Sequence, residues 1–382
     1  MTRPEDLQKA IENPCYKVIS FDIFDTLVLR PSIFPTDLFT IVGRECGQND
    51  SFATIRRNCE SMARKKLIVG EEEILYSDIY DVMKRCYEYS NADIEKLSQK
   101  ELECEFSFLS ARKSTKKLFD LAKSLGKKVI IVSDIYLSYS FISKMLSHCG
   151  YDGYDKLYLS SEYKLTKSSG RLYQVVISDL REQGIEPSEV LHIGDNERSD
   201  IASAKRQGLS AMQISRVEAI ANVDVRFRRL RSFADRRCDN TFPLGFAINR
   251  VYDDYDKVPS ADNKNSFISN KDAVAEVLFA PLIFTYAKWL VDECVRRGKS
   301  SVVFINNEGL LLEKVIRRIS ECIAPDLDIV RCTTDYDIRK LAKCSASDII
   351  GSKIDPGMTV KDFVYDFTGV SLEKSDVSTV RK

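Results

Sequence analysis

Two carboxylates, a serine and a lysine follow apolar segments of the chain, and their side chains suit the chemistry of phosphate esters. Asp22 follows "VISF", Ser133 ends "KKVIIVS", Lys167 lies in "LTKSSG" and Asp195 follows "VLHIG". A carboxylate can attack phosphorus or hold a hard cation, whereas hydroxyl and ammonium groups bind phosphate oxygens. Each residue alone is equally typical of a turn, a helix cap or a solvated surface. Only their joint order indicates a common site.

The apolar segments predict the strands of one parallel sheet. They lie within residues 18–21, 127–134, 155–162, 188–200 and 209–215. Amphipathic segments stand between them, such as "STKKLFDLAKSLG", whose final glycine is a helix stop signal. Strands that alternate with helices of this length favour a parallel sheet covered on both faces, and such sheets bind ligands at the carboxyl ends of their strands. The polar residues fall at those ends.

The segment of about a hundred residues that follows the first strand does not show this alternation of strands and helices. Apolar residues recur at helical spacing in "TDLFTIVGREC", "SFATIRRNCESMARKKL", "SDIYDVMKRCYEY" and "NADIEKLSQKELECEFSFL". The spacing predicts a helical subdomain inserted after the first strand, where it would act as a lid. Arg30 and Arg56 could contact anions there, although arginines are also common on ordinary surfaces.

The 382-residue chain is longer than one ordinary core, so more than one module is expected. Polar "SADNKNSFISNKD" indicates a linker, and "SSVVFI" followed by "LLLEKVIRRIS" indicates a further α/β unit. We predict a core domain at 1–34 and 113–240, a helical cap at 35–112, a linker at 241–272 and a C-terminal α/β module at 273–382.

The charge balance argues against a general nucleic-acid or membrane-surface binder. The chain has 57 basic and 57 acidic residues, a formal net charge of zero. Six arginines gather in residues 226–237, but no aromatic stacking platform accompanies them. They favour a solvated helix face or a partner for acids of the C-terminal module. We therefore expect no nucleic-acid partner.

Cysteine and histidine usage favours a cytoplasmic protein. Eleven cysteines occur without a Cys-x-x-Cys pair, which is typical of free thiols in a reducing compartment. With only His148 and His192, a histidine-rich zinc site or a serine triad is not expected. The N-terminus lacks the apolar core of a signal peptide, and "VLFAPLIFTYA" is too short to span a bilayer. We expect no membrane span.

Taken together, "FDIFDTLVLRP", "VSD", "KSSG" and "GDNERSD" resemble the haloacid dehalogenase-like (HAD) superfamily over about residues 15–216. Most members are magnesium-dependent phosphatases. The resemblance implies a Rossmann-like HAD fold with a helical cap. It also implies that Asp22 is the nucleophile and forms an aspartyl-phosphate, and that Mg²⁺ is held by Asp22, the carbonyl of Phe24 and Asp195.

The resemblance assigns supporting roles to five further residues. Thr26, Ser133 and Lys167 would bind the phosphate of the substrate. Asp200 and Asn196 would lie behind them, where Asp200 orients metal-bound water or Lys167. The substrate would be a small phosphorylated metabolite, plausibly a sugar phosphate.

Phe24 is a departure from the family pattern. Family phosphatases usually carry at this position a second aspartate, which protonates the leaving alkoxide and contributes roughly 10²–10⁴-fold in rate. The next residue, Asp25, could replace it, the leaving group could need no acid, or the site could be slow or inactive. A dehalogenase or a phosphonate hydrolase is the less favoured hypothesis. Carbon–halogen hydrolysis needs no metal ion, whereas Asp195 and Asp200 are suited to bind a metal ion.

A closer resemblance links the chain to predicted HAD hydrolases associated with bacterial surface-polysaccharide and glycosyltransferase systems. In that subgroup a second region carries a strand ending in Phe-Leu-x-Arg-Asp-Gly. Here the matching stretch is "VVFINNEGLLLEKV", with Asn307 and Glu308 in place of Arg-Asp. The C-terminal module would then be a degenerate HAD or Rossmann-like unit that is structural or binds a partner. The alternative function is an inactive scaffold that binds a glycosyltransferase or another polysaccharide-biosynthesis protein.

Overall fold

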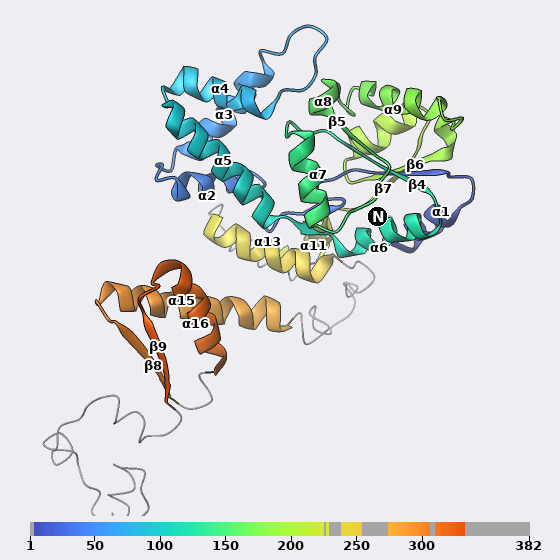
Figure 1. The fold of residues 1–382 in the computed structure, drawn as a ribbon. Coiled ribbons are helices and arrows are strands. Elements are labelled where there is room, and N and C mark those ends of the chain that lie inside the picture. Colours follow the sequence, from blue (N-terminus) through green and yellow to red (C-terminus); the bar gives the residue numbers. More distant parts are fainter. Residues whose placement is uncertain (1–3, 225–226, 229–237, 254–273, 306–309, 333–382) are drawn as a thin grey trace, which may run out of the picture. The chain divides into compact units, whose positions relative to one another are not determined.

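The computed structural model of the chain describes residues 4–224, 227–228, 238–253, 274–305 and 310–332. The chain divides into two compact units, Met1–Val277 and Leu278–Lys382, and each is described by itself. Figure 1 shows their elements, coloured along the sequence.

A five-stranded parallel sheet forms the centre of the first unit and confirms the predicted α/β class. Its order is β5-β4-β1-β6-β7, so that β1 lies in the middle. Phe21 pairs with Ile131 on one side and with Ile193 on the other. The residues that follow β4, β1 and β6 therefore share one edge of the sheet. The strands are β1 (Val18–Phe21), β4 (Lys128–Ser133), β5 (Lys156–Leu159), β6 (Val190–Gly194) and β7 (Ser210–Gln213).

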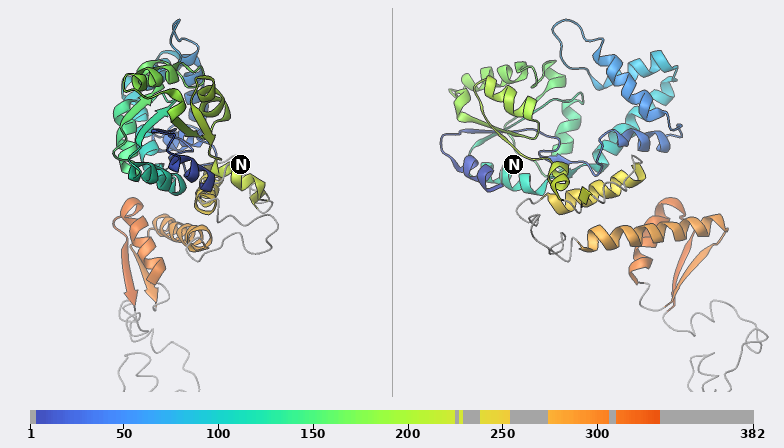
Figure 2. Two further views of the ribbon diagram at one scale, coloured as in Figure 1. Left: turned by 90° about the vertical axis from the view of Figure 1, so that its right-hand side faces the viewer. Right: turned by 180° about the vertical axis from the view of Figure 1, so that it is seen from behind.

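Helices cover both faces of this sheet. Successive residues of β1 face opposite sides, so Ile19 and Phe21 join one apolar cluster and Val18 joins another. All four residues of β1 are buried, so its sequence does not alternate between apolar and polar residues, and its one polar residue, Ser20, contacts the buried ring of His192. Helices α1 (Pro4–Glu12), α6 (Lys113–Ser124) and α7 (Tyr139–His148) cover the first cluster, and α9 (Arg171–Arg181) and α10 (Ser203–Arg206) cover the second (Figure 2).

Short elements complete the carboxyl edge. The predicted helix after β6 is present but begins as a π-helical turn, η2 (Glu197–Ala202), before it continues into α10. Gly208 ends it with φ +89°, a backbone conformation that glycine adopts without strain. Three further short helices connect the strands of this unit or follow the last of them. They are α8 (Ser160–Tyr163), η1 (Pro187–Glu189) and α11 (Val217–Val223).

The helical insertion predicted after the first strand is present. Its four helices gather beside the sheet and share their own apolar cluster, with Phe52, Ile79, Met83 and Leu97 at its centre (Figure 1). They are α2 (Asp37–Glu45), α3 (Phe52–Arg64), α4 (Tyr76–Tyr87) and α5 (Asn91–Phe108). A two-stranded antiparallel ribbon, β2 (Val28–Leu29) with β3 (Ser110–Ala111), brackets them where the chain leaves and re-enters the core.

The start of the predicted linker at 241–272 is helical. Helix α13 (Cys238–Tyr252) packs on α11, where Ile248 and Tyr252 join Ile220 in one apolar cluster. Its Gly245 approaches Pro31 so closely that an added Cβ would lie 2.8 Å from the Pro31 carbonyl oxygen. The segment 241–252 is therefore part of the first unit. The rest of the predicted linker, residues 254–272, lies outside the described residues, as does most of the arginine cluster at 226–237.

The second unit is a small α/β arrangement. Strands β8 (Ser301–Ile305) and β9 (Asp328–Cys332) are parallel, and α16 (Leu310–Ile323) connects them. Helix α15 (Ala280–Arg296) follows a π-helical turn, η4 (Ala275–Phe279), and packs with α16 around Val291 and Ile316. Asn307 and Glu308 lie outside the described residues.

No helix in the described ranges is long and apolar enough to cross a membrane. The apolar stretch 277–287 runs into the charged part of α15, which includes Lys288 and Asp292.

Asp253, which follows α13, caps a helix far away in the sequence. Its carboxylate accepts hydrogen bonds from the backbone N–H of Lys113 at 2.7 Å and from both the N–H and the hydroxyl of Ser114 at the start of α6. The Arg112 guanidinium lies 3.6 Å away. Asp253→Ala should lower the free energy of unfolding by about 2 kcal/mol, because α6 loses its cap and Arg112 its carboxylate partner.

Urea unfolding followed by circular dichroism measures this loss. Asp50→Ala, at an exposed position, is the matched control and should change stability by less than about 0.5 kcal/mol. Equal stabilities of the two variants would contradict the capping role of Asp253.

Candidate active site

Asp22 leaves the end of β1 and receives two side-chain donors on one oxygen. Lys167 Nζ donates to Asp22 Oδ1 at 2.5 Å, and Ser133 Oγ donates to the same atom at 2.9 Å. These side chains come from three separate segments: the end of β1, the end of β4 and the loop before α9. The parallel register brings them together at the carboxyl edge, as the sequence predicted for ligand-binding residues.

Lys167 is held between two carboxylates. Its ammonium also donates to Asp200 Oδ1 at 2.6 Å, and the residue is 2% exposed. Burial alone would lower the pKa of Lys167, but Asp200 and Asp22 raise it well above its usual value. Burial would likewise raise the pKa of Asp200, yet the neighbouring ammonium holds it well below its usual range. Lys167 and Asp200 are therefore both ionised.

Asp200 is fixed from behind by the residues that follow β6. The backbone N–H of Asn196 donates to Asp200 Oδ2 at 2.9 Å, and Asn196 Oδ1 caps η2 by accepting from Arg198 and Ser199. Gly194 is required at this point, because an added Cβ would lie 2.4 Å from the Asp200 carboxylate. His192, which the sequence placed in a strand, lies in β6 with Nε2 3.5 Å from Asp200 Oδ1.

Three carboxylates converge on one point. Oxygen atoms of Asp22, Asp195 and Asp200 all lie within 4.8 Å of one another. Burial raises the pKa of Asp22 to about 7; Lys167 opposes this shift, while Asp200 and Asp195 add to it. Hard oxygen donors in this number and proximity fit a divalent cation such as Mg²⁺ or Ca²⁺, which would relieve their mutual repulsion.

Thr26, which the resemblance assigned to phosphate binding, contacts a carboxylate in the structure. Its side chain is fully buried, and its hydroxyl donates to Asp195 Oδ1 at a long 3.4 Å. Arg216 Nε donates to the other oxygen, Asp195 Oδ2, at 2.5 Å. Thr26 therefore orients a carboxylate from behind, whereas Arg216, for which the sequence offered no signal, stands at the cavity.

Phe24 and Asp25 form the turn after β1. Asp25 has φ +56°, a left-handed conformation that aspartate tolerates better than most residues, and Arg112 holds its carbonyl oxygen at 2.7 Å. The Asp25 carboxylate is partly exposed and lies 3.9 Å from Arg216 Nε. The ring of Phe24 lies 4.1 Å beneath the guanidinium of Arg30. An arginine stacked on an aromatic ring thus stands beside the position where family phosphatases carry their acid.

Two neighbouring cavities bear on the site. The smaller, of about 390 Å³, is lined by all the predicted site residues except Thr26: Asp22, Phe24, Asp25, Ser133, Lys167, Asp195, Asn196 and Asp200. The larger, of about 650 Å³, lies between the cap helices and the core loop 135–137. Arg30 lines it and pairs with Glu105. Arg56 is instead buried within the cap, where it bonds to Glu101 at 2.7–2.8 Å.

Sequence reasoning missed the residues that hold the Lys167 loop. Asp134 accepts from the backbone N–H of Lys167 at 2.7 Å and from that of Ser168 at 3.4 Å. Ser203 Oγ donates to the Lys167 carbonyl at 2.5 Å. The "VSD" motif places Asp134 at the strand end, which was a usable signal. Ser203 lies within a helix and carried none.

The chain matches a family model described as haloacid dehalogenase-like hydrolase over residues 16–208, just over half of its length. A comparison with curated proteins found no match. Among solved structures, the chain is similar to a HAD phosphatase from Thermococcus onnurineus, with 22% identity, 52% of this chain and 86% of that chain covered, and a TM-score of 0.36. A HAD family enzyme from Bacteroides thetaiotaomicron has 18% identity, coverages of 53% and 94%, and a TM-score of 0.39.

Removing the Lys167 ammonium should destabilise the first unit strongly. Lys167→Met leaves Asp22 and Asp200 buried without their cation, which costs about 3–5 kcal/mol in the free energy of unfolding. Urea unfolding followed by circular dichroism measures the change.

Lys144→Met is the matched control. Lys144 is exposed in α7, and substitutions at such surface positions usually change stability by less than about 0.5 kcal/mol. A loss for Lys167→Met as small as that of the control would contradict the balance of charges described for the site.

Proposed function

The chain belongs to the haloacid dehalogenase-like hydrolase family, and from this premise we propose that it is a Mg²⁺-dependent phosphatase that hydrolyses a small phosphorylated metabolite such as a sugar phosphate. The observation that carries the proposal is the single oxygen of Asp22 on which Lys167 and Ser133 converge. A carboxylate with two donors beside it and a cavity in front of it is suited to meet a phosphate group.

Asp22, the carbonyl oxygen of Phe24 and Asp195 would hold the metal ion. When bound, a divalent cation neutralises negative charge on the phosphate and on the carboxylates that surround it. The three clustered carboxylates support this assignment, because they offer hard oxygen ligands. Thr26 and Arg216 would set the orientation of Asp195, which both of them contact.

Asp22 would act as the nucleophile in two steps. A carboxylate oxygen attacks phosphorus, the bond from phosphorus to the leaving oxygen breaks, and an aspartyl-phosphate forms. Water then attacks the phosphorus, which releases inorganic phosphate and regenerates the Asp22 carboxylate. Lys167 and Ser133, which contact Asp22 in the structure, would donate to the phosphate oxygens and offset their charge. Asp200 would keep the ammonium of Lys167 in place between these steps.

Protonation of the leaving group is the step for which this chain lacks the usual residue. Phe24 cannot donate a proton, and Asp25, the acid next in sequence, faces Arg216. The proposal therefore favours substrates with a stabilised leaving oxygen, such as the anomeric oxygen of a sugar 1-phosphate. The remainder of the substrate would occupy the cavity of about 650 Å³, where apolar and charged side chains such as Phe39, Tyr136 and Arg64 are available.

A second candidate function is a weakly active or inactive scaffold in surface-polysaccharide biosynthesis, with a glycosyltransferase as partner. The observation that favours it is Phe24 at the acid position with Arg30 stacked on its ring. In either case we propose residues 1–34 and 113–240 as the core, 35–112 as the cap and 273–382 as the C-terminal module, with residues 241–252 added to the core because α13 packs on α11. We also propose a cytoplasmic location, which is supported by the eight cysteines whose side chains the structure describes, because all of them are free thiols.

Phosphate release from a broad panel of phosphorylated metabolites, with and without Mg²⁺, tests the phosphatase. We expect at least one sugar phosphate to be hydrolysed, and Asp22→Asn to lower kcat/KM by about 10³-fold or more, because the nucleophile is lost. Chelation of the divalent ion should abolish the activity.

Two variants serve as controls in the same assays. Asp152→Asn makes the same change at an exposed position and should leave turnover as in the wild type. Phe24→Asp should raise turnover of poor leaving groups by about 10-fold or more if the missing acid limits the rate. No release by the wild type or by Phe24→Asp would favour the scaffold.

A further inference from the structure

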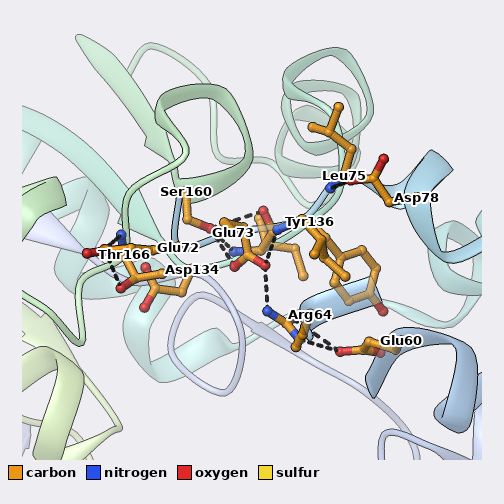
Figure 3. A network of polar contacts seen from close by, with 12 residues as sticks. Glu60, Arg64, Glu72, Glu73, Leu75, Asp78, Asp134, Tyr136, Ser160 and Thr166 are labelled. Carbon is orange, nitrogen blue, oxygen red and sulfur yellow. Dashed lines mark hydrogen bonds and ion pairs between the residues drawn. The ribbon is translucent and has the colours of Figure 1, made fainter. Parts of the chain in front are cut away.

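The segment of residues 70–76, here termed the strap, belongs to the connection between cap helices α3 and α4. It makes hydrogen bonds to the core. The backbone N–H of Glu72 donates to the Lys164 carbonyl at 2.9 Å, and that of Tyr76 donates to the Tyr136 carbonyl at 3.0 Å. Figure 3 shows two of its side chains directed at core loops, Glu72 towards Thr166 and Glu73 towards Ser160. These two loops follow Ser133 and carry Lys167. The cap thus contacts both phosphate-binding segments of the proposed active site.

The Glu72 carboxylate accepts four of the hydrogen bonds between the strap and the core. One oxygen, Oε2, accepts hydrogen bonds from the Thr166 N–H at 2.8 Å, the Thr166 hydroxyl at 3.0 Å and the Ser169 hydroxyl at 2.6 Å. The other, Oε1, accepts from Arg171 at 3.2 Å. Burial alone would raise the pKa of Glu72, but the hydrogen bonds from Ser169 and Thr166 lower it. Its carboxylate therefore ties together the residues on both sides of Lys167.

Glu73 anchors the strap to the other loop. Its Oε2 accepts from Ser160 Oγ at 3.0 Å, and Ser160 Oγ in turn accepts from the backbone N–H of Ile135 at 2.7 Å. Its Oε1 accepts from Arg64 at 2.6 Å, and Arg64 also lines the large cap cavity. Figure 3 shows this chain from Arg64 through Glu73 to Ser160. The two adjacent glutamates of the strap therefore bind different active-site loops.

The Lys167 loop needs such support because it has little regular structure of its own. It lies between Lys164 and Gly170, both with positive φ, and precedes α9. Asp134 and Ser203 hold the backbone of Lys167 from the core, whereas Glu72 contacts the loop from the cap, where the Glu73 carbonyl also accepts from Lys164 at 3.3 Å. Misplacement of a catalytic group by about 1 Å can cost about 10²-fold in rate. The position of the Lys167 ammonium therefore depends on both sides of the loop.

We propose that Glu72 is a positioning residue, through which the docked strap holds Lys167 in the geometry needed to bind phosphate. Cap docking and phosphate binding are then coupled, because the strap belongs to the cap and the loop to the core. This inference rests on the proposed phosphatase for the role of Lys167. The coupling itself rests on the hydrogen bonds at Thr166 and Ser169.

The test compares three variants of the full chain. Glu72→Ala removes the four contacts of the carboxylate. Glu72→Gln retains a carbonyl oxygen that can accept from Thr166 and Ser169. Glu71→Ala is the matched control, since the Glu71 side chain has no hydrogen bond or ion pair to any residue that the structure describes. The readouts are hydrogen–deuterium exchange of residues 164–170, the Kd of inorganic phosphate measured with Mg²⁺ present, and kcat with KM on the best substrate.

Glu72→Ala should accelerate exchange at 164–170, weaken phosphate binding about 10-fold and lower kcat more than it raises KM. Glu72→Gln should recover most of each loss, and Glu71→Ala should match the wild type. A merely structural role would lower stability without this pattern of rescue. Wild-type exchange at 164–170 in Glu72→Ala overturns the inference whatever the activity. Accelerated exchange in that variant, with no phosphate release by any variant, supports the positioning of the Lys167 loop by Glu72 and contradicts the proposed phosphatase activity.

Discussion

The structure of the site depends on one buried ammonium shared by two carboxylates. Lys167 lies between Asp22 and Asp200 at 2.5 and 2.6 Å, almost without access to solvent. Charges in such a place are stable only when they are paired and hydrogen-bonded. With Asp195 close by, three carboxylates face the two cations of Lys167 and Arg216. The remaining negative charge suits a divalent cation, and the charge of that cation would in turn allow a phosphate to enter the cavity.

The rest of the first unit serves to bring these charges together. Asp22 follows the central strand, and its neighbours in the sheet carry Ser133 on one side and Gly194 on the other. Gly194 gives Asp200 the space to approach, and His192 fills the layer beneath, with Ser20 Oγ 2.8 Å from its Nδ1. Burial lowers the pKa of His192, which keeps a second positive charge away from Lys167. A parallel sheet with β1 at its centre thus sets the spacing of the site.

The strands and the residues at their ends could be predicted because both signals are local. An apolar run followed by Asp22, Ser133 or Asp195 is visible in a few consecutive residues. The sequence was less informative where distant contacts decide. Thr26 was assigned to phosphate, and no local pattern records that its hydroxyl contacts Asp195, 169 positions away. Residues 241–252 were placed in a linker, although α13 completes an apolar cluster with α11 and β2, a pairing that no local pattern records. Glu72 lies in the acidic segment 71–73, which is typical of an exposed surface, and only folding brings it to Thr166.

A structure of the protein with Mg²⁺ and beryllium fluoride, a mimic of a phosphoryl group, tests the central claim most directly. The account predicts beryllium bonded to a carboxylate oxygen of Asp22, with its fluorides within hydrogen-bonding distance of Ser133 Oγ and Lys167 Nζ. Beryllium fluoride bound elsewhere, or Lys167 and Ser133 still on Asp22 with no fluoride in the cavity at saturating concentrations, would contradict it.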